Sequence, residues 1–206
     1  MTSRMPPKNV LLLLCEGAEL SEIAAFVDVL GWSTSDGAVP VTVTTASTNG
    51  SEVVCTFGVR VRADRRCGDL DAADFDGLAI PGGFESFNYY ADAYSPAAQD
   101  LIRQFVALGK PVATICVGAL PLAKTGCLVG RRATTYHLMN GLRRKQLADL
   151  GAVVVDEMVV EDGPFITSTS PASAMEVALR LLARVTGTDN ATAIRNLMGF
   201  GRAPSA

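Results

Sequence analysis

Residues 111–120 read PVATICVGAL, and this stretch decides the fold. The apolar run Pro111–Ile115 predicts a buried strand, and a helix over Gly118–Lys124 begins almost at once. Cys116 falls at the junction. A strand that turns into a helix with almost no loop forces a sharp turn and exposes the junction side chain at the edge of the sheet. The pattern predicts an α/β protein with a nucleophile elbow at Cys116.

The position of Cys116 favours a reactive thiol, although a buried structural cysteine fits the same spacing. The N-terminus of the following helix supplies oriented N–H groups and a positive partial charge. Both effects favour the thiolate, so we expect the pKa of Cys116 to be lowered. We interpret the remaining cysteines as structural; they are Cys15, Cys55, Cys67 and Cys127.

The rest of the chain alternates short apolar runs with amphipathic stretches. Val10–Cys15 and Gly77–Ile80 are wholly apolar or nearly so, which is typical of parallel strands covered on both faces. Glu19–Leu30 and Pro96–Leu108 carry apolar residues at helical spacing. This alternation predicts a doubly wound, mostly parallel sheet with helices on both faces. Further strands are expected at Val39–Thr45, Ala133–Tyr136, Val153–Val155, Met158–Glu161 and Phe165–Ser168, and further helices at Leu142–Leu150, Ala172–Leu182 and Thr188–Leu197. The segment Val53–Val61 is expected to form a hairpin or a short pair of edge strands.

Composition indicates a globular chain without a nucleic-acid or membrane partner. Of the 206 residues, 49% are hydrophobic and 19% are charged, which supports a sizeable buried core. The net charge is −3, and the basic run Arg143-Arg144-Lys145 is interpreted as a solvated helix face. No apolar run approaches the ~20 residues that span a bilayer. Without repeats or linkers, we expect one domain over residues 1–206, with its core at about 9–186 and a helix and tail at 188–206.

The cysteine and histidine pattern indicates neither a disulfide framework nor a metal site. The five cysteines include no C-x-x-C pair, and His137 is the only histidine. We therefore expect no metal and no cofactor. The run Val10–Cys15 is short and is followed by Glu16, which predicts a strand rather than a signal peptide. A cytoplasmic location is expected.

Two further strand ends carry candidate chemistry. Pro81-Gly82-Gly83 follows a predicted strand, and consecutive glycines let main-chain N–H groups approach a ligand closely, as in an oxyanion hole. An ordinary tight turn explains the same motif. Glu22 lies in the apolar face of the first predicted helix, where burial would keep its carboxyl protonated; an exposed first-turn glutamate is the alternative. We interpret Glu19 and Asp28 as surface residues.

Taken together, the motifs resemble the ThiJ/PfpI family from about Asn9 to Thr186. The resemblance implies a flavodoxin-like α/β sandwich related to class I glutamine amidotransferases. It also implies a homodimer, with the first helix near the interface. The motifs that carry the resemblance occur in order at fitting spacings: Glu16–Glu22, Leu78–Gly83, Ile115–Ala119, Gly130–Thr135 and Ile166–Ser168.

The resemblance also implies roles for individual residues. Cys116 is the implied nucleophile, and Glu22 hydrogen-bonds its sulfur. The main-chain N–H groups of Gly83 and Val117 form the implied oxyanion hole, with Gly82 as a further candidate. No metal and no cofactor enter this site.

The histidine of the site departs from the family pattern. In the deglycase branch, the catalytic histidine directly follows a Thr-Thr pair. Here Thr134-Thr135 is followed by Tyr136, and His137 comes one residue later. Either His137 substitutes for that histidine as a catalytic residue, or Tyr136 faces the sulfur and His137 points elsewhere.

Three functions remain open on the sequence. The first is a cofactor-free enzyme for small reactive carbonyls, of the glyoxalase III or deglycase type, in which the Cys116 thiolate attacks an aldehyde and Glu22 moves the proton. The second is an isocyanide hydratase or amidase-like hydrolase that uses the same thiolate on a small-molecule substrate. The third is a non-enzymatic redox or stress sensor, in which Cys116 is oxidised.

Overall fold

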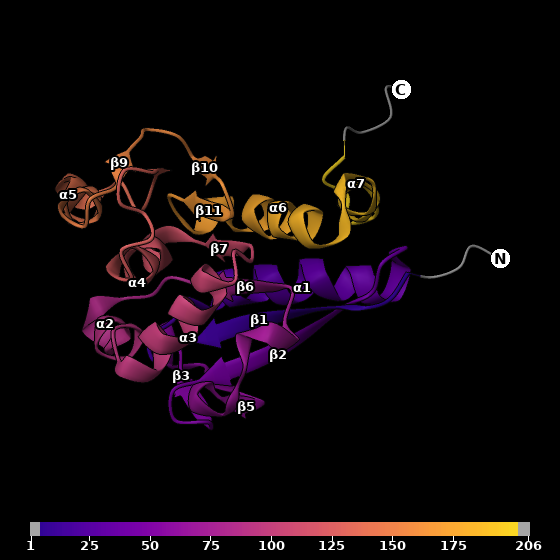
Figure 1. Ribbon diagram of the computed structural model, residues 1–206, viewed down its shortest axis with the longest axis horizontal. Coiled ribbons are helices and arrows are strands. Elements are labelled where there is room, and N and C mark those ends of the chain that lie inside the picture. Colours follow the sequence, from indigo (N-terminus) through magenta and orange to yellow (C-terminus); the bar gives the residue numbers. More distant parts are fainter. Residues whose placement is uncertain (1–4, 202–206) are drawn as a thin grey trace.

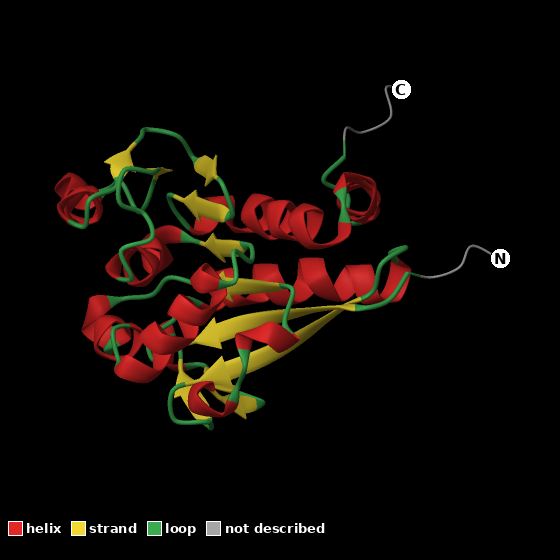
Figure 2. Ribbon diagram, viewed as in Figure 1, coloured by secondary structure: helices red, strands yellow, loops and turns green. Residues whose placement is uncertain are grey.

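The computed structural model describes residues 5–201 and contains a seven-stranded sheet in the order β10-β11-β7-β6-β1-β2-β5 (Figures 1 and 2). Neighbouring strands run parallel, except that β10 and β11 are antiparallel. The predicted doubly wound, flavodoxin-like fold is confirmed. The strands are β1 (Lys8–Leu14), β2 (Val41–Ser47), β5 (Arg65–Arg66), β6 (Gly77–Ile80), β7 (Val112–Thr114), β10 (Val159–Asp162) and β11 (Phe165–Ser168).

Helices cover both faces of this sheet. Helices α1 (Leu20–Asp36), α6 (Ala174–Thr186) and α7 (Thr188–Leu197) pack against one another on one face. Helices α2 (Tyr89–Ala93), α3 (Pro96–Ala107) and α4 (Ala119–Lys124) belong to the other face, and α5 (Leu142–Asp149) packs on α4. The sequence pattern did not predict α2, because five residues are too few for helical periodicity to show.

The core follows from this layering. Residues 10–14 of β1 are all buried, on both sides of the strand, because helices cover both faces of the central sheet. The register places Leu12 beside Ala79 of β6, and Ile80 of β6 beside Thr114 of β7. The carboxyl ends of β1, β6 and β7 therefore finish next to one another, where ligands bind in open α/β sheets.

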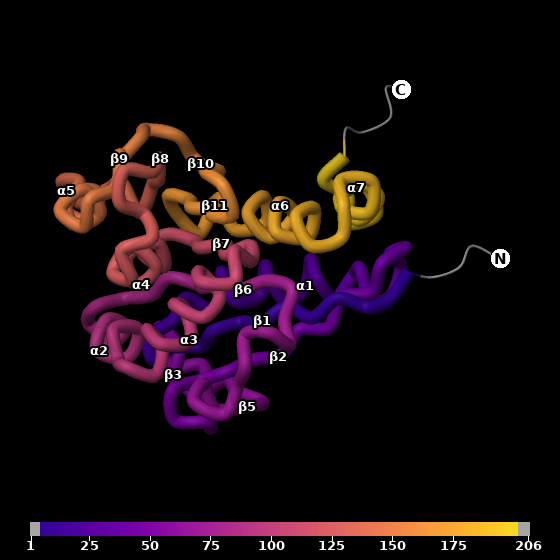
Figure 3. The backbone as a smooth tube through the Cα atoms, viewed as in Figure 1, coloured from indigo at the N-terminus to yellow at the C-terminus, as the bar shows by residue number. Residues whose placement is uncertain are grey.

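Two small sheets lie outside the main one. The predicted hairpin is present as β3 (Glu52–Val54) paired antiparallel with β4 (Arg60–Arg62). Strand β8 (Arg132–Ala133) pairs in parallel with β9 (Val153–Val154), and Figure 3 shows them beside α5.

The predicted strand at Ala133–Tyr136 is wrong beyond Ala133. There the chain makes side-chain contacts in place of a strand ladder. The Thr134 N–H donates to Thr167 Oγ1 at 3.0 Å, and the Thr135 hydroxyl donates to the Cys116 carbonyl at 2.8 Å.

Helix α1 continues six residues beyond its predicted end at Leu30. Residues 31–36 are mostly small or polar, so they carry no apolar periodicity from which a helix could be predicted. Ser33 is nevertheless buried, and its hydroxyl donates to the Val39 carbonyl at 2.7 Å. The Asn190 side chain of α7 donates to the same hydroxyl at 2.8 Å, and this tertiary contact holds the end of the helix.

Candidate active site

Cys116 lies in a sharp junction between β7 and α4. Residues 116–118 form a 3-10 turn that leads directly into α4. The φ of Cys116 is +54°, a left-handed conformation that costs a non-glycine residue about 1–2 kcal/mol. The Thr135 hydroxyl holds the Cys116 carbonyl in this turn. The backbone strain is that of a nucleophile elbow, with the thiol partly exposed.

Glycines let the end of β6 touch this elbow. A Cβ added at Gly118 would lie 2.4 Å from the Ile80 carbonyl oxygen. One added at Gly82 would lie 2.9 Å from the Ile115 carbonyl oxygen and 3.1 Å from Cys116 Cβ. Neither space admits a side chain, so the two strand ends interlock only with glycine at both positions.

A cavity of about 220 Å³ opens beside Cys116. It brings together residues that follow β1, β6, β7 and β11 with residues from the segment after β8. Of the residues proposed for the site from the sequence, those that line the cavity are Glu22, Gly83, Cys116, Val117 and Tyr136.

Glu22 is completely buried beneath this cavity. Its Oε2 accepts a hydrogen bond from the Gly82 N–H at 2.5 Å, while Oε1 has no nitrogen or oxygen partner within residues 5–201. Burial raises the pKa of Glu22 to about 8; the charge of Glu19 adds to this, and hydrogen bonds with Gly82 and Cys116 oppose it. Glu22 is therefore mainly protonated at pH 7, and the N–H of Gly82 holds this carboxyl.

The expected low pKa of Cys116 is wrong in direction. Burial raises the pKa of the thiol, and a charged Glu22 raises it further, while the Val117 N–H opposes both. Helix α4 has only six residues and begins after the 3-10 turn, so its dipole does not offset the desolvation. The two groups form a coupled pair, in which a thiolate is stable only while Glu22 keeps its proton.

Main-chain N–H groups point to an anion site beside the sulfur. The bridge between Ala18 and Gly83 uses the N–H groups of Glu19 and Phe84, which donate to Gly82 and Gly17 at 2.9 and 3.0 Å. The Gly83 N–H is left without an acceptor in the described part of the chain. The Val117 N–H lies near the Cys116 sulfur and lowers the pKa of that thiol. Two N–H groups beside a thiol are the donors that an oxyanion hole needs.

His137 lies apart from this cavity. It lines a separate pocket of about 310 Å³ with Asp156, Met158 and other residues of the β9–β10 segment. Its Nδ1 is buried and has no hydrogen-bond partner among residues 5–201. Tyr136, not His137, lines the cavity of Cys116.

Six residues that line the cavity were not proposed for the site from the sequence: Glu19, Phe84, Glu85, Met139, Arg143 and Pro171. The interpretation of Glu19 as a surface residue is wrong, because it is partly buried at the start of α1 beside the sulfur. The basic run is also not a uniform solvated face. The side chain of Arg143 is 17% exposed, whereas that of Lys145 is 72% exposed. A charge run carries no local signal that separates the two.

Within residues 5–201, no cluster of His, Cys, Asp and Glu side chains is arranged to hold a metal ion. In the same range no helix is both long and apolar enough to cross a membrane. The five cysteines are free; Cys116 and Cys127 are partly exposed, and the others are buried. Cys127, which we interpreted as a structural cysteine, is therefore half-buried and not part of the fully buried core.

The structure thus combines a strained cysteine elbow and paired glycines at the carboxyl edge of a flavodoxin-like sheet. The chain belongs to the DJ-1/PfpI family, whose sequence profile matches residues 8–184. The resemblance to ThiJ/PfpI proteins is thereby confirmed.

Similar proteins span most of the chain. Protein dj-1beta of Drosophila melanogaster is 32% identical over 183 residues, which make up 88% of this chain and 91% of that protein. Its crystal structure matches with a TM-score of 0.79 at 30% identity, covering 93% of this chain and 97% of that one. A structure of Toxoplasma gondii DJ-1, described as oxidized, matches with a TM-score of 0.76 at 26% identity over 93% of this chain and 97% of that one. The isonitrile hydratase of Pseudomonas putida is 31% identical over 134 residues, 65% of this chain and 56% of that protein.

Proposed function

We propose that this protein is a cofactor-free, cysteine-dependent enzyme that converts small reactive carbonyls, in the manner of a glyoxalase III or a deglycase. One observation carries the proposal: the Cys116 thiol and a buried, protonated Glu22 share a small cavity with two main-chain N–H donors. Once this pair has lost one proton to solvent, the remaining proton can pass between the sulfur and the carboxylate, so the two groups supply a nucleophile and an acid–base group without a metal.

The first step is attack on an aldehyde. The thiolate of Cys116 forms a C–S bond to the aldehyde carbon of a 2-oxoaldehyde, and the carbonyl electron pair moves to oxygen. The N–H groups of Gly83 and Val117 stabilise that oxygen. Glu22 supplies the proton that completes the hemithioacetal.

The next steps move two protons within the substrate. The carboxylate form of Glu22 removes the hydrogen from the former aldehyde carbon and returns it to the neighbouring carbon. The hydroxyl proton of the hemithioacetal passes to the former ketone oxygen, which yields a 2-hydroxy thioester. Water then hydrolyses the thioester and frees the thiol. Methylglyoxal plus water thus gives lactate and one proton, with atoms and electrons balanced.

The decisive experiment measures lactate from methylglyoxal without glutathione. We expect turnover by the wild type and a loss of at least about 10³-fold in Cys116→Ser, since the nucleophile is removed. Cys127→Ser is the matched control, because Cys127 is the other partly exposed thiol. Equal turnover in Cys116→Ser and the wild type would refute the proposal.

A hydratase is the second candidate, favoured by the likeness to the Pseudomonas isonitrile hydratase. The same thiolate would attack the terminal carbon of an isocyanide, and water would release an N-formyl amine. Formamide produced by the wild type and absent in Cys116→Ser supports this candidate. If isocyanides and small amides show no Cys116-dependent turnover, the candidate fails.

Oxidation of Cys116 is the third candidate, favoured by its partial exposure beside a protonated carboxyl and by the likeness to an oxidized relative. Two equivalents of hydrogen peroxide convert the thiol to a sulfinic acid and two waters, and Glu22 would donate a hydrogen bond to that product. Mass spectrometry after mild peroxide treatment compares Cys116 with buried Cys55. Equal oxidation of the two excludes a sensor role.

We further propose that the protein acts in the cytoplasm as a homodimer through α1. A shallow hollow on this helix is lined by Val27, Gly31 and Trp32, and the apolar side chains of Val27 and Trp32 are 41% and 40% exposed. Five free thiols suit a reducing compartment. Trp32→Glu should shift the sedimentation coefficient from dimer to monomer. A monomeric wild type would refute the dimer.

A further inference from the structure

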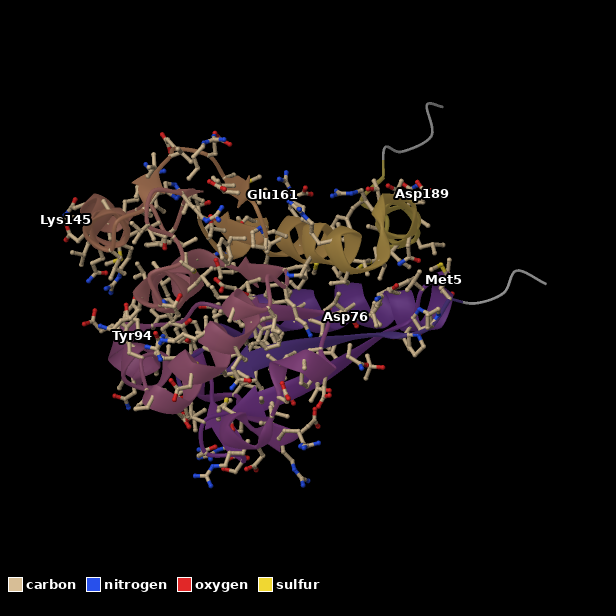
Figure 4. All side chains as sticks on the ribbon, viewed as in Figure 1. Met5, Asp76, Tyr94, Lys145, Glu161 and Asp189 are labelled. Atoms are coloured by element: carbon tan, nitrogen blue, oxygen red, sulfur yellow. The ribbon has the colours of Figure 1, made fainter. Side chains whose placement is uncertain are left out.

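Arg143, near the start of α5, carries a guanidinium into the cavity of Cys116. This guanidinium lies over the ring of Tyr90 in α2, 4.8 Å from its centroid, and Nη1 donates to Gln146 Oε1 at 3.0 Å. Figure 4 labels Lys145 on α5 and Tyr94 after α2, the two neighbourhoods that Arg143 joins. Since its side chain is only 17% exposed, Arg143 is held in place by packing.

The partner of Arg143 is held much more loosely. Nη2 donates to Glu85 Oε2 at 2.7 Å, but the Glu85 side chain is 68% exposed. An exposed carboxylate gains about 0–1 kcal/mol from such a pair. A carboxylate on a bound molecule can therefore replace Glu85 while the guanidinium stays where it is, and a guanidinium binds carboxylates through paired N–H groups.

The charges of the cavity are divided between its two sides. Glu19 and Glu22 of the α1 region act directly on the sulfur, and both raise the pKa of Cys116. The charge of Arg143 acts on the other side of the cavity, where it lowers the pKa of Tyr90 and of Tyr94 against the effect of burial. An anionic group on the substrate is repelled by Glu19 and attracted by Arg143, which would direct the uncharged carbonyl end towards Cys116.

We propose that Arg143 determines specificity, so that the preferred substrates are 2-oxoaldehydes that carry a carboxylate at the far end. This assignment rests on the proposed function and names its substrate class. For 4,5-dioxopentanoate the reaction is the one derived above: the aldehyde carbon forms the C–S bond, its hydrogen moves to the neighbouring carbon, and water releases 2-hydroxyglutarate and one proton.

The test compares kcat/KM for 4,5-dioxopentanoate with that for 2-oxopentanal, which has the same chain length and no charge. We expect the ratio of the two to fall by about 10- to 100-fold in Arg143→Gln, the range for loss of a charge-assisted hydrogen bond. Arg143→Lys should retain part of the preference, and Glu85→Gln should raise it several-fold because the competing carboxylate is gone. Lys145→Gln is the matched control on the same helix, and its ratio should equal that of the wild type.

A binding measurement separates this inference from the proposed function. Calorimetry compares 2-hydroxyglutarate with 2-hydroxypentanoate on the wild type and on Arg143→Gln, and it needs no turnover. A preference for 2-hydroxyglutarate that disappears in Arg143→Gln supports the role of Arg143 even if no aldehyde is converted. Equal discrimination by wild type and Arg143→Gln, in turnover or in binding, overturns it.

Discussion

Tyr136 and His137 are neighbours in the chain, yet they line two different hollows. Their ring centroids are 6.3 Å apart. Tyr136 faces the cavity of Cys116, and His137 faces the pocket beside Asp156. The two neighbouring side chains leave the backbone towards different hollows, so a shift of one residue would exchange them. A displacement of one residue along the chain is therefore enough to decide whether a histidine side chain lies in the cavity of the thiol.

The carboxyl groups in the two hollows also differ in the direction of their pKa shifts. Beside Cys116 a buried carboxyl with a raised pKa is in contact with the sulfur. Beside His137 the acidic neighbour Asp156 is exposed, and Arg144 lowers its pKa through a hydrogen bond and its charge. The Cys116 cavity therefore has its own acid–base group without the imidazole.

The largest expected effect contrasts Glu22 with His137. Glu22→Gln should lower kcat for methylglyoxal by about 10²–10⁴-fold, the usual contribution of a general acid–base group. His137→Gln should change kcat by less than about threefold, since its side chain lies in the other pocket. Steady-state lactate assays on both variants check this. A larger loss in His137→Gln than in Glu22→Gln would reverse the comparison.

The second effect concerns how the free energy of unfolding depends on pH. The pKa of Glu22 is raised from 4.5 to about 8, so the folded protein binds this proton more tightly than the unfolded chain does. The contribution of Glu22 to the free energy of unfolding therefore falls as pH rises from about 4.5 to 8, by up to about 4 kcal/mol.

Urea unfolding of the wild type and Glu22→Gln at pH 5, 6, 7 and 8 measures this difference. The gap between the two free energies of unfolding should shift steadily in favour of Glu22→Gln as the pH rises. Parallel curves would show that Glu22 titrates normally.

A third effect tests the close approach of strand ends. In Gly82→Ala, the new Cβ meets the Ile115 carbonyl at 2.9 Å, so the elbow must shift. We expect a loss of about 1–3 kcal/mol in the free energy of unfolding, as for other overpacked sites, together with reduced activity. Gly68→Ala is the matched control, since nothing lies within 4 Å of its added Cβ. Equal stability of the two variants would show that the interlock is not tight.

The smallest effect exchanges the two faces. The double variant Tyr136→His, His137→Tyr places the imidazole beside Cys116. Its pH–rate profile should gain an ionisation near ~6.5, the ordinary pKa of histidine, with kcat changed by less than about tenfold. A profile identical to that of the wild type would mean that position 136 does not reach the reacting atoms.

Several elements were predictable because their signals are local. Gly77–Ile80, Phe165–Ser168 and Thr188–Leu197 match the observed β6, β11 and α7 residue for residue. The first is a short apolar run, the second is rich in β-forming residues, and both are bounded by turn residues, while the third has helical periodicity. The junction at Cys116 belongs with them, because a strand and a helix without a loop leave one conformation for the residue between.

Other features depend on neighbours that are distant in the chain. The last turns of α1 are held by Asn190, 157 residues from Ser33 in sequence. The exposure of Arg143 depends on Tyr90 of another helix. The direction of the Cys116 pKa depends on burial, which the helix-terminus argument does not contain.

The sequence by itself determined the doubly wound sheet, the strained cysteine at its edge and the glycines that let β6 approach it, since periodicity, turn chemistry and the absence of a Cβ are written in adjacent residues. Only the tertiary structure decided that Tyr136 and not His137 lines the cavity, that Glu22 is buried and protonated, and that Arg143 enters the site. These three features depend on burial and on contacts between separate helices and strands. Neither can be worked out from a local stretch of sequence.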